Sequence, residues 1–197
     1  MSRAGLLVTA SLAAAALVVP ALHPMAPRLL WNASASTPIG LYLIRPGTPP
    51  AIGDIVAVAP PDALARFLAG GGYLPDGVPL LKHVVALKEQ TVCRTGLVVT
   101  VDGKPVARAL SRDRRGRALP VWQGCRRLGS DEVFLLNPEI HDSLDGRYFG
   151  PLPLSAVIGV AVPLWIERPD DEPKAPPPQA EHPLPKPKTG ASHATDR

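Results

Sequence analysis

The spacing of apolar and polar residues divides the chain into three segments. Residues 1–27 hold one long uncharged run, Ala4–Leu22. Residues 28–166 alternate short apolar runs with glycine, proline and aspartate, which is typical of strands separated by turns. Residues 167–197 hold eight of the 25 prolines mixed with charged residues. We therefore expect an N-terminal apolar helix, one folded domain, and a disordered, partly polyproline tail.

The first segment is predicted to direct the protein to a membrane. The run Ala4–Leu22 has 19 residues behind the basic Arg3, enough to span a bilayer as a helix. Its alanines also offer small-residue cleavage sites, so a cleaved signal peptide is the competing interpretation, and a buried core helix is the third. Export or anchoring fits the extreme N-terminal position best.

The middle segment is predicted to be mainly β. Apolar runs rich in β-branched residues indicate strands at Leu41–Ile44, Asp54–Val58, Leu80–Leu87, Leu97–Val101, Val133–Leu136 and Ala156–Leu164. The pair Asp102-Gly103 predicts a type I′ hairpin, because both central residues of that turn need a positive φ. One short helix is expected at Ala63–Ala69, with Asp62 and Gly70 as its caps. These elements predict small antiparallel sheets or a partly open barrel.

Composition removes several classes of protein. The 25 prolines argue against a helical bundle, and two cysteines are too few for a disulfide scaffold or a four-thiolate zinc site, so neither metal nor cofactor is expected. The positive charge concentrates in Arg108–Arg127, with seven arginines and one aspartate. This patch could meet acidic lipid headgroups or an acidic partner, or be a solvated loop. Without base-stacking aromatics, nucleic acid is not expected.

Two further features of the middle segment depend on their surroundings. Cys93 and Cys125 would form a disulfide outside the cytoplasm, and would be two buried thiols inside it. Lys82 lies among apolar residues and, with a period of two, shares a face with Val84 and Ala86. Burial would lower the pKa of this lysine and make it a general base, whereas on an edge strand it would reach water.

Three clusters together resemble a known family. Ser-x-Pro-x-Gly-x-Tyr at 36–42 follows the apolar segment, Lys82 opens an embedded Lys-His-Val-Val run, and Ser-x-Asp-Gly-Arg-Tyr-Phe-Gly follows at 143–150. This order is similar to the signal peptidase I superfamily, and in particular to its TraF-like conjugative-transfer branch. The resemblance covers residues 32 to about 165. It implies a serine–lysine peptidase on a β-rich fold at the outer, periplasmic face of the bacterial cytoplasmic membrane.

The resemblance also implies roles for single residues. Ser36 matches the nucleophile and Lys82 the general base. Ser34 matches a hydroxyl that assists the oxyanion hole, and Ser143 a residue that orients the lysine. Asp145 matches an acid required in the TraF-like branch, and Arg147 its salt-bridge partner.

The sequence departs from the general pattern at three places. Signal peptidases usually place the nucleophile three residues before the proline, where Ala35 stands, whereas the TraF-like spacing fits Ser36. His83 replaces an arginine, and Ala86–Gln90 replaces a Gly-x-Pro-Gly-Asp loop.

The expected substrate is an exported precursor protein such as a conjugative pilin, cleaved near membrane lipid by hydrolysis or cyclisation. A non-catalytic envelope assembly protein that keeps the fold is the alternative. A Ser–His–Asp hydrolase could use His83 or His141 together with Asp142, but the sequence lacks a Gly-x-Ser-x-Gly elbow. A soluble self-cleaving repressor would need a helix-turn-helix, which we do not find.

Overall fold

The structure is a computed structural model that describes residues 5, 8–9, 11–14 and 28–167. Most of the expected N-terminal helix, Ala4–Leu22, lies outside the described residues, and so does the tail from residue 168 onward. Within the described part of the chain, no helix is long and apolar enough to cross a membrane.

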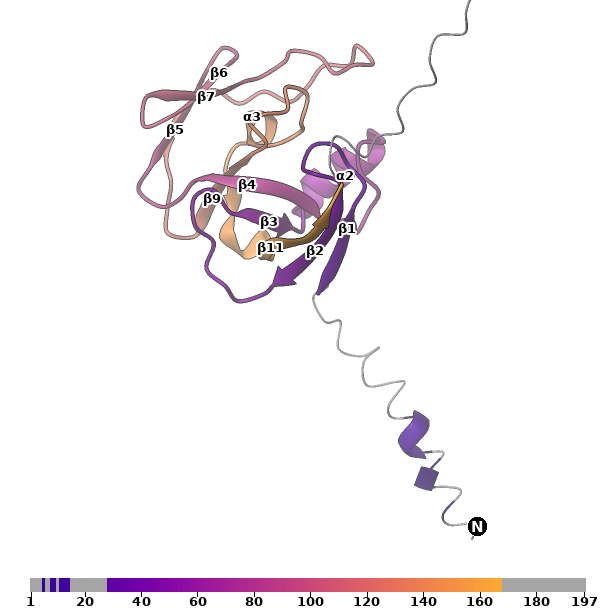
Figure 1. The fold of residues 1–197 in the computed structure, drawn as a ribbon. Coiled ribbons are helices and arrows are strands. Elements are labelled where there is room, and N and C mark those ends of the chain that lie inside the picture. The colour runs from indigo at the N-terminus through magenta and orange to yellow at the C-terminus, as the bar shows by residue number, and fades with distance from the viewer. Residues whose placement is uncertain (1–4, 6–7, 10, 15–27, 168–197) are drawn as a thin grey trace, which may run out of the picture. The chain divides into compact units, whose positions relative to one another are not determined.

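Two antiparallel sheets form the folded domain (Figure 1). The seven-stranded sheet has the order β1 (Leu29–Asn32), β2 (Gly40–Arg45), β11 (Val157–Ile166), β3 (Ile55–Val58), β4 (Leu80–Ala86), β9 (Glu132–Leu136) and β10 (Leu152–Pro153). The four-stranded sheet has the order β7 (Lys104–Arg108), β6 (Val98–Val101), β5 (Thr91–Thr95) and β8 (Gly124–Arg127). The helices of this domain, within residues 28–167, are α2 (Asp62–Gly70), α3 (Gly146–Phe149) and a 3₁₀ turn at Leu154–Ala156. The prediction of a mainly β fold with small antiparallel sheets is confirmed.

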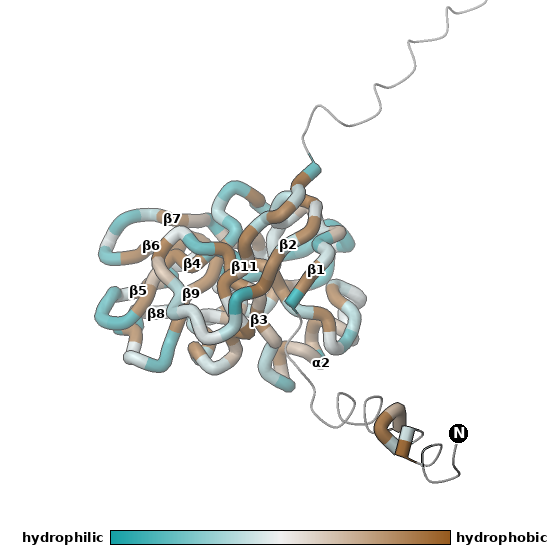
Figure 2. Tube along the Cα trace, turned by 60° about the horizontal axis from the view of Figure 1, so that its bottom comes forward, coloured by the Kyte–Doolittle hydropathy of each residue, from teal (hydrophilic) through white to brown (hydrophobic). Residues whose placement is uncertain are grey.

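The strands β4 and β9 hold the two sheets together. On one side, Ala86, Phe134 and Leu136 pack with Val92 and Val99 of the four-stranded sheet. Val84, Val133 and Leu135 pack into a second cluster within the larger sheet. In β9 this follows from the period of two, which sends neighbouring side chains to opposite faces, whereas in β4 the register shifts between Val84 and Ala86, so these two residues enter different clusters. Figure 2 shows the hydrophobic strands β2 and β11 side by side, with hydrophilic residues concentrated in the loops.

The predicted hairpin turn is confirmed, and the predicted helix caps are wrong. Asp102 and Gly103 have φ of 48° and 77° and join β6 to β7, as a type I′ turn requires. The predicted caps of α2 are each one residue off. Pro61 occupies the N-cap position, which leaves Asp62 in the first turn, and Gly71 ends the helix by donating its N–H to Phe67 O.

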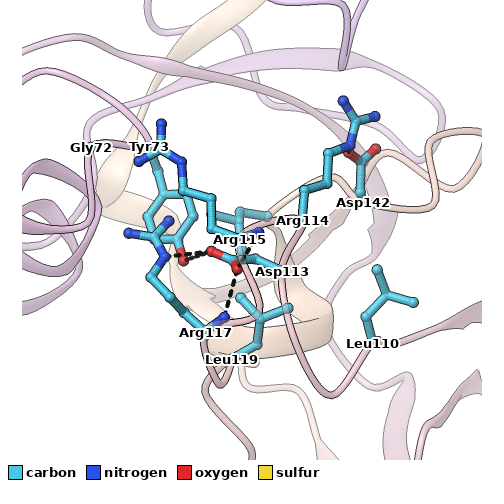
Figure 3. A pocket seen from close by; sticks show the side chains of 10 residues that line it. Gly72, Tyr73, Leu110, Asp113, Arg114, Arg115, Arg117, Leu119 and Asp142 are labelled. Carbon is cyan, nitrogen blue, oxygen red and sulfur yellow. Dashed lines mark hydrogen bonds and ion pairs between the residues drawn. The ribbon is translucent and has the colours of Figure 1, made fainter.

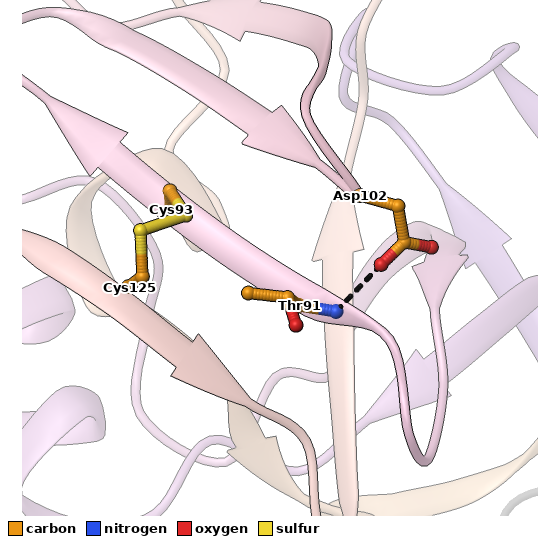
Figure 4. Close-up of a disulfide and its surroundings, with 4 residues drawn as sticks. All are labelled: Thr91, Cys93, Asp102 and Cys125. Atoms are coloured by element: carbon orange, nitrogen blue, oxygen red, sulfur yellow. Dashed lines mark hydrogen bonds between the residues drawn. A yellow bond between two sulfur atoms is a disulfide. The ribbon is translucent and has the colours of Figure 1, made fainter.

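A disulfide joins Cys93 of β5 to Cys125 of β8, directly opposite each other in the four-stranded sheet (Figure 4). The start of β5 is fixed by Asp102, whose carboxylate accepts hydrogen bonds from the N–H of Thr91 (2.8 Å) and from Gln90 Nε2 (2.9 Å). These bonds hold the pKa of the Asp102 carboxyl below its ordinary value. Strand β5 is therefore constrained at its first residue by Asp102 and at its middle residue by the disulfide.

Candidate active site

The loop between β1 and β2 carries the two candidate serines. Ser34 Oγ lies 2.9 Å from Ser36 Oγ, and the N–H of Ser36 donates to Ser34 Oγ over 3.3 Å. Both serines are solvent-accessible. The two hydroxyls and one main-chain N–H thus form a compact polar cluster at the surface.

Asn32 holds this loop in place from the end of β1. Its Oδ1 accepts the N–H of Ser34 (3.1 Å), and its Nδ2 donates to the main-chain oxygens of Ser34 (2.9 Å), Thr37 (2.9 Å) and Pro38 (3.1 Å). Tyr42 OH donates to the same Pro38 oxygen over 2.7 Å. Since Asn32 and Tyr42 are buried, the turn around Ser36 is fixed by the core beneath it.

Lys82 lies in the interior of the seven-stranded sheet. Its strand β4 is paired with β3 on one side and β9 on the other, and its side chain is only 4% exposed. The interpretation as an edge-strand lysine that reaches water is therefore wrong. Lys82 Nζ donates a hydrogen bond to Ser143 Oγ over 2.8 Å. Burial lowers the pKa of Lys82 to about 8, against the attraction of Asp145 and with the repulsion of Arg147.

Asp145 and Arg147 form a buried ion pair beside Ser143. The carboxylate of Asp145 accepts Arg147 Nε (2.9 Å), a terminal nitrogen of the same guanidinium (2.7 Å) and the N–H of Asn137 (2.9 Å). The guanidinium also donates to the main-chain oxygens of Asn137, Ile140 and His141. Burial alone would lower the pKa of Arg147, but the hydrogen bonds and charge of Asp145 outweigh it and raise that pKa. This pair fixes the loop that carries Ser143.

One groove of about 650 Å³ brings four of the predicted residues together: Ser34, Ser36, Lys82 and Ser143. Its apolar wall includes Leu68, Leu74, Leu80, Ile140 and Leu144. Asp145 and Arg147 do not line this groove, and the disulfide lies in the other sheet. Within the described part of the chain, no hydrogen bond joins Ser36 to Lys82. The arrangement places a hydroxyl and an amine of lowered pKa in one cavity.

The sequence did not single out the residues that join these loops to each other. Thr37 Oγ1 donates to the main-chain oxygen of Leu81 over 3.2 Å and accepts Asn137 Nδ2 over 3.2 Å. Asn137 Oδ1 also lies 3.1 Å from His83 Nδ1. Thr37 directly follows Ser36 and Asn137 lies six residues before Ser143, and only these positions near the motifs mark the two residues in the sequence.

The described residues contain no group of three or more His, Cys, Asp or Glu side chains that could bind a metal ion. The groove offers the hydroxyls of Ser34, Ser36 and Ser143, the amine of Lys82 and the main-chain N–H of Ser36.

Comparisons with known proteins identify the family of the chain. Residues 1–166 match the model of the family described as signal peptidase, peptidase S26. A probable conjugal transfer protein TraF of Sinorhizobium fredii is 38% identical over 66% of this chain and 73% of its own. A plasmid transfer protein TraF of Escherichia coli is 36% identical over 68% of this chain and 80% of its own.

Among solved structures, a signal peptidase I of Enterococcus faecalis V583 is similar over 57% of this chain and 97% of its own, with a TM-score of 0.35 and 19% identity. The family model spans most of the chain, and relatives above 30% identity cover two thirds of it. The chain therefore belongs to the S26 family of signal peptidases, which are serine peptidases.

Proposed function

We propose that this protein is a membrane-bound serine endopeptidase that cleaves exported precursor proteins, with Ser36 as the nucleophile and Lys82 as the general base. The names of its relatives point to conjugation, so pilin precursors of a conjugative transfer system are the proposed substrates. No cofactor is needed, because a serine and a neutral amine suffice for acyl transfer.

The burial of Lys82 is the single observation that carries the proposal. A solvated lysine is almost wholly protonated at neutral pH and cannot accept a proton. At 4% exposure and with a pKa of about 8, Lys82 is neutral in a useful fraction of molecules. Its hydrogen bond to Ser143 orients the amine, because a neutral amine that donates one N–H in this way can direct its lone pair into the groove.

In the proposed first step, the Ser36 hydroxyl turns from Ser34 toward Lys82. Lys82 takes the hydroxyl proton while Ser36 Oγ attacks the substrate carbonyl. The carbon–nitrogen bond then breaks, and the lysine ammonium returns its proton to the leaving amine. The product of this step is an ester between the substrate and Ser36.

The negative charge on the carbonyl oxygen needs hydrogen-bond donors. The Ser36 N–H and the Ser34 hydroxyl are the two closest candidates, because they already contact each other beside the nucleophile. In the free enzyme this N–H donates to Ser34 Oγ, so substrate binding would have to redirect it.

Two groups can release the acyl-enzyme. Water would give a linear product, and an amine of the same substrate chain would give a cyclic one. The apolar wall of the groove fits a substrate with small apolar residues at the cleavage site.

An exposed aromatic pair next to the serine loop supports a position at the membrane surface. Trp31 of β1 and Trp165 of β11 stack with ring centroids 5.6 Å apart, and their side chains are 57% and 53% exposed. Leu29, Leu164 and Ile166 are exposed on the same strands. Tryptophan favours the interface between water and lipid, and the serine loop begins two residues after Trp31. The proposed site would therefore meet a membrane-held substrate near the bilayer.

Coexpression with candidate pilin precursors tests the proposal. We expect the wild-type protein to shorten a precursor, and Ser36→Ala and Lys82→Ala each to leave it intact, as followed by mass spectrometry. Ser130→Ala and Lys104→Ala are matched controls at exposed positions. A product lighter than the linear mature peptide by one water would identify cyclisation.

Processing that persists in both Ser36→Ala and Lys82→Ala would exclude the serine–lysine mechanism. If the wild-type protein processes no precursor, the alternative of a non-catalytic envelope or pilus assembly protein is favoured. In that case Lys82 would have a structural role only.

A further inference from the structure

The loop Ser111–Leu119, which we call the arginine loop, is a rigid and strongly basic hairpin. Residues 112–117 contain four arginines and one aspartate. The main chain is closed by a bridge between Arg112 and Ala118 and by the bond from Leu119 N–H to Ser111 O (3.1 Å). Because the main chain of this loop is already fixed, a ligand that binds its side chains loses little free energy to ordering the loop.

Asp113 organises the interior of the arginine loop (Figure 3). Its carboxylate accepts the N–H groups of Arg115 (2.9 Å) and Arg117 (2.8 Å), Tyr73 OH (2.6 Å) and Arg117 Nε (2.6 Å). The hydrogen bond from Tyr73, together with those from the two arginines, holds the pKa of the Asp113 carboxyl well below its usual range. The guanidinium of Arg117 also lies over the Tyr73 ring and donates to Gly71 O. Asp113 and Arg117 therefore pair with each other and are not available to bind a ligand.

Of the other three arginines of the loop, Arg112 donates to Gly116 O within the loop, and Arg114 and Arg115 are available to other partners. The Arg115 guanidinium is exposed and has no ion pair with any described residue. Arg114 Nε pairs with Asp142 at 2.6 Å, but these side chains are 84% and 33% exposed. A pair so open to water is weak and exchanges readily. Arg114 can therefore turn to another carboxylate.

These arginines line a cavity of about 260 Å³ that adjoins the groove of the proposed active site. The cavity and the groove share Tyr73, Arg114, Asp142 and Leu144. Asp142 directly precedes Ser143, the partner of Lys82. A peptide lying in the groove can therefore extend a side chain or its end toward the arginines.

We propose that this cavity, which we call the arginine pocket, binds a carboxylate of the peptide substrate. The carboxylate would belong to an acidic side chain near the scissile bond or to the substrate's free C-terminus. Arg115 would bind it through the parallel N–H groups of its guanidinium, and Arg114 would join by leaving Asp142. This inference deepens the proposed function, because it assigns a charge preference to the same groove.

Peptide binding to the full-length protein in detergent micelles, with Ser36→Ala to prevent turnover, tests the inference. The probes are fluorescent nine-residue alanine–serine peptides with an amidated C-terminus and one glutamate, moved through the nine positions. Matched peptides carry glutamine, and a third set carries glutamine with a free C-terminal carboxylate. We expect either glutamate at one position or the free carboxylate to bind about tenfold more tightly than the neutral peptide.

Substitutions at Arg115 assign the preference to the arginine pocket. Arg115→Gln should bring the affinity ratio of acidic to neutral peptide close to one. Arg115→Glu should reverse it, so that a lysine peptide binds best, and a misfolded protein could not produce this gain. Arg108→Gln, at an exposed position of β7 outside the pocket, should keep the wild-type ratio.

Equal affinities for the glutamate, glutamine and free-acid peptides would overturn the inference. It would also be overturned if Arg115→Gln weakened binding to phosphatidylglycerol vesicles and left the affinity ratio of acidic to neutral peptide unchanged. The arginines would then bind lipid headgroups and not the substrate. The binding measurement does not depend on cleavage. The two proposals can therefore fail independently. If the precursor is not processed but acidic peptides still bind more tightly than neutral ones, the serine–lysine mechanism is wrong and the arginine pocket is not.

Discussion

The side-chain amide of Asn137 donates a hydrogen bond to Thr37 Oγ1 over 3.2 Å, although 100 residues separate them in the chain. Thr37 Oγ1 in turn donates to the main-chain oxygen of Leu81, the residue before Lys82. The serine loop, the lysine strand and the loop that leads to Ser143 therefore meet in one buried network. The relative position of Ser36 and Lys82 depends on side chains that take no part in the reaction.

Thr37→Val should test this dependence, because it keeps the shape of the side chain and removes its donor and acceptor. Thr37 is buried, and although Asn137 Nδ2 would keep its bond to the main-chain oxygen of Leu81 (3.3 Å), the loss of both hydrogen bonds of Thr37 Oγ1 should lower the free energy of unfolding by about 1–3 kcal/mol in urea titrations. A displaced serine loop should also lower kcat. Thr95→Val, at the exposed end of β5, should change stability by less than about 0.5 kcal/mol. Full kcat in Thr37→Val would limit the network to a role in stability.

The activity should rise with pH through the pKa of Lys82. Only neutral lysine can accept the Ser36 proton, and burial lowers the pKa of Lys82 to about 8. We therefore expect kcat/KM for a peptide substrate to increase about tenfold per pH unit well below 8 and to level off above it. Since Asp145 raises this pKa, residual activity in Asp145→Asn should show a lower midpoint. A profile that is flat between pH 6 and 9 would contradict a lysine base.

The stability of the protein should rise over an adjoining range of pH. The pKa of Lys82 is about 8 in the folded protein, against the ordinary value of 10.5 for a lysine in the unfolded chain, so between these pH values the unfolded chain binds more protons. The free energy of unfolding therefore increases with pH in that window, by about 3 kcal/mol in all. Lys82→Met should remove this increase and should be more stable than the wild type at pH 7. Lys104→Met, at an exposed position, should retain the wild-type slope.

The two acids of the Ser143 loop should differ sharply in their effect on stability. Asp145→Asn would leave the Arg147 guanidinium charged and buried without its partner, at a cost of about 3–5 kcal/mol. Asp142→Asn removes only the exposed pair with Arg114 and should cost less than about 1 kcal/mol. Urea unfolding of the two variants measures the difference. If both variants lost the same free energy of unfolding, the stability of the Ser143 loop would depend on its total negative charge and not on the buried pair of Asp145 with Arg147.

Much of the fold could be predicted from the sequence because its strands alternate or carry β-branched runs. Four strands were not predicted, β1, β5, β8 and β10, and two of them, β5 and β8, show why. β8 has the sequence Gly-Cys-Arg-Arg and lies wholly exposed, so it has no apolar pattern. β5 buries Arg94, whose guanidinium donates to the main-chain oxygens of Gly96 and Arg147. The bond to Arg147 O spans 53 residues and has no local signal, so the sequence alone suggests that Arg94 is an exposed loop residue.

The candidate site also has features that the sequence predicts and features that it does not. The residue types and spacing of the serine and lysine motifs are local, so the sequence could indicate them. Whether Lys82 reaches water depends on which strands flank β4, and pairing with β9 joins residues about 50 apart. The bond between Thr37 and Asn137 spans 100 residues and has no local signal. Contacts that exist only after the sheets assemble could not be predicted.

The membrane surface proposed for this protein predicts which tryptophans contact lipid. The chain has three tryptophans. Trp31 and Trp165 are exposed and stacked, whereas Trp122 donates Nε1–H to Gly146 O (2.9 Å) and packs against Phe134. In vesicles with bromine-labelled acyl chains, we expect bromine to quench the fluorescence of the first two and spare the third, because bromine quenches only on contact. Trp122→Phe should therefore retain all of the quenchable signal, and Trp31→Phe combined with Trp165→Phe should lose it.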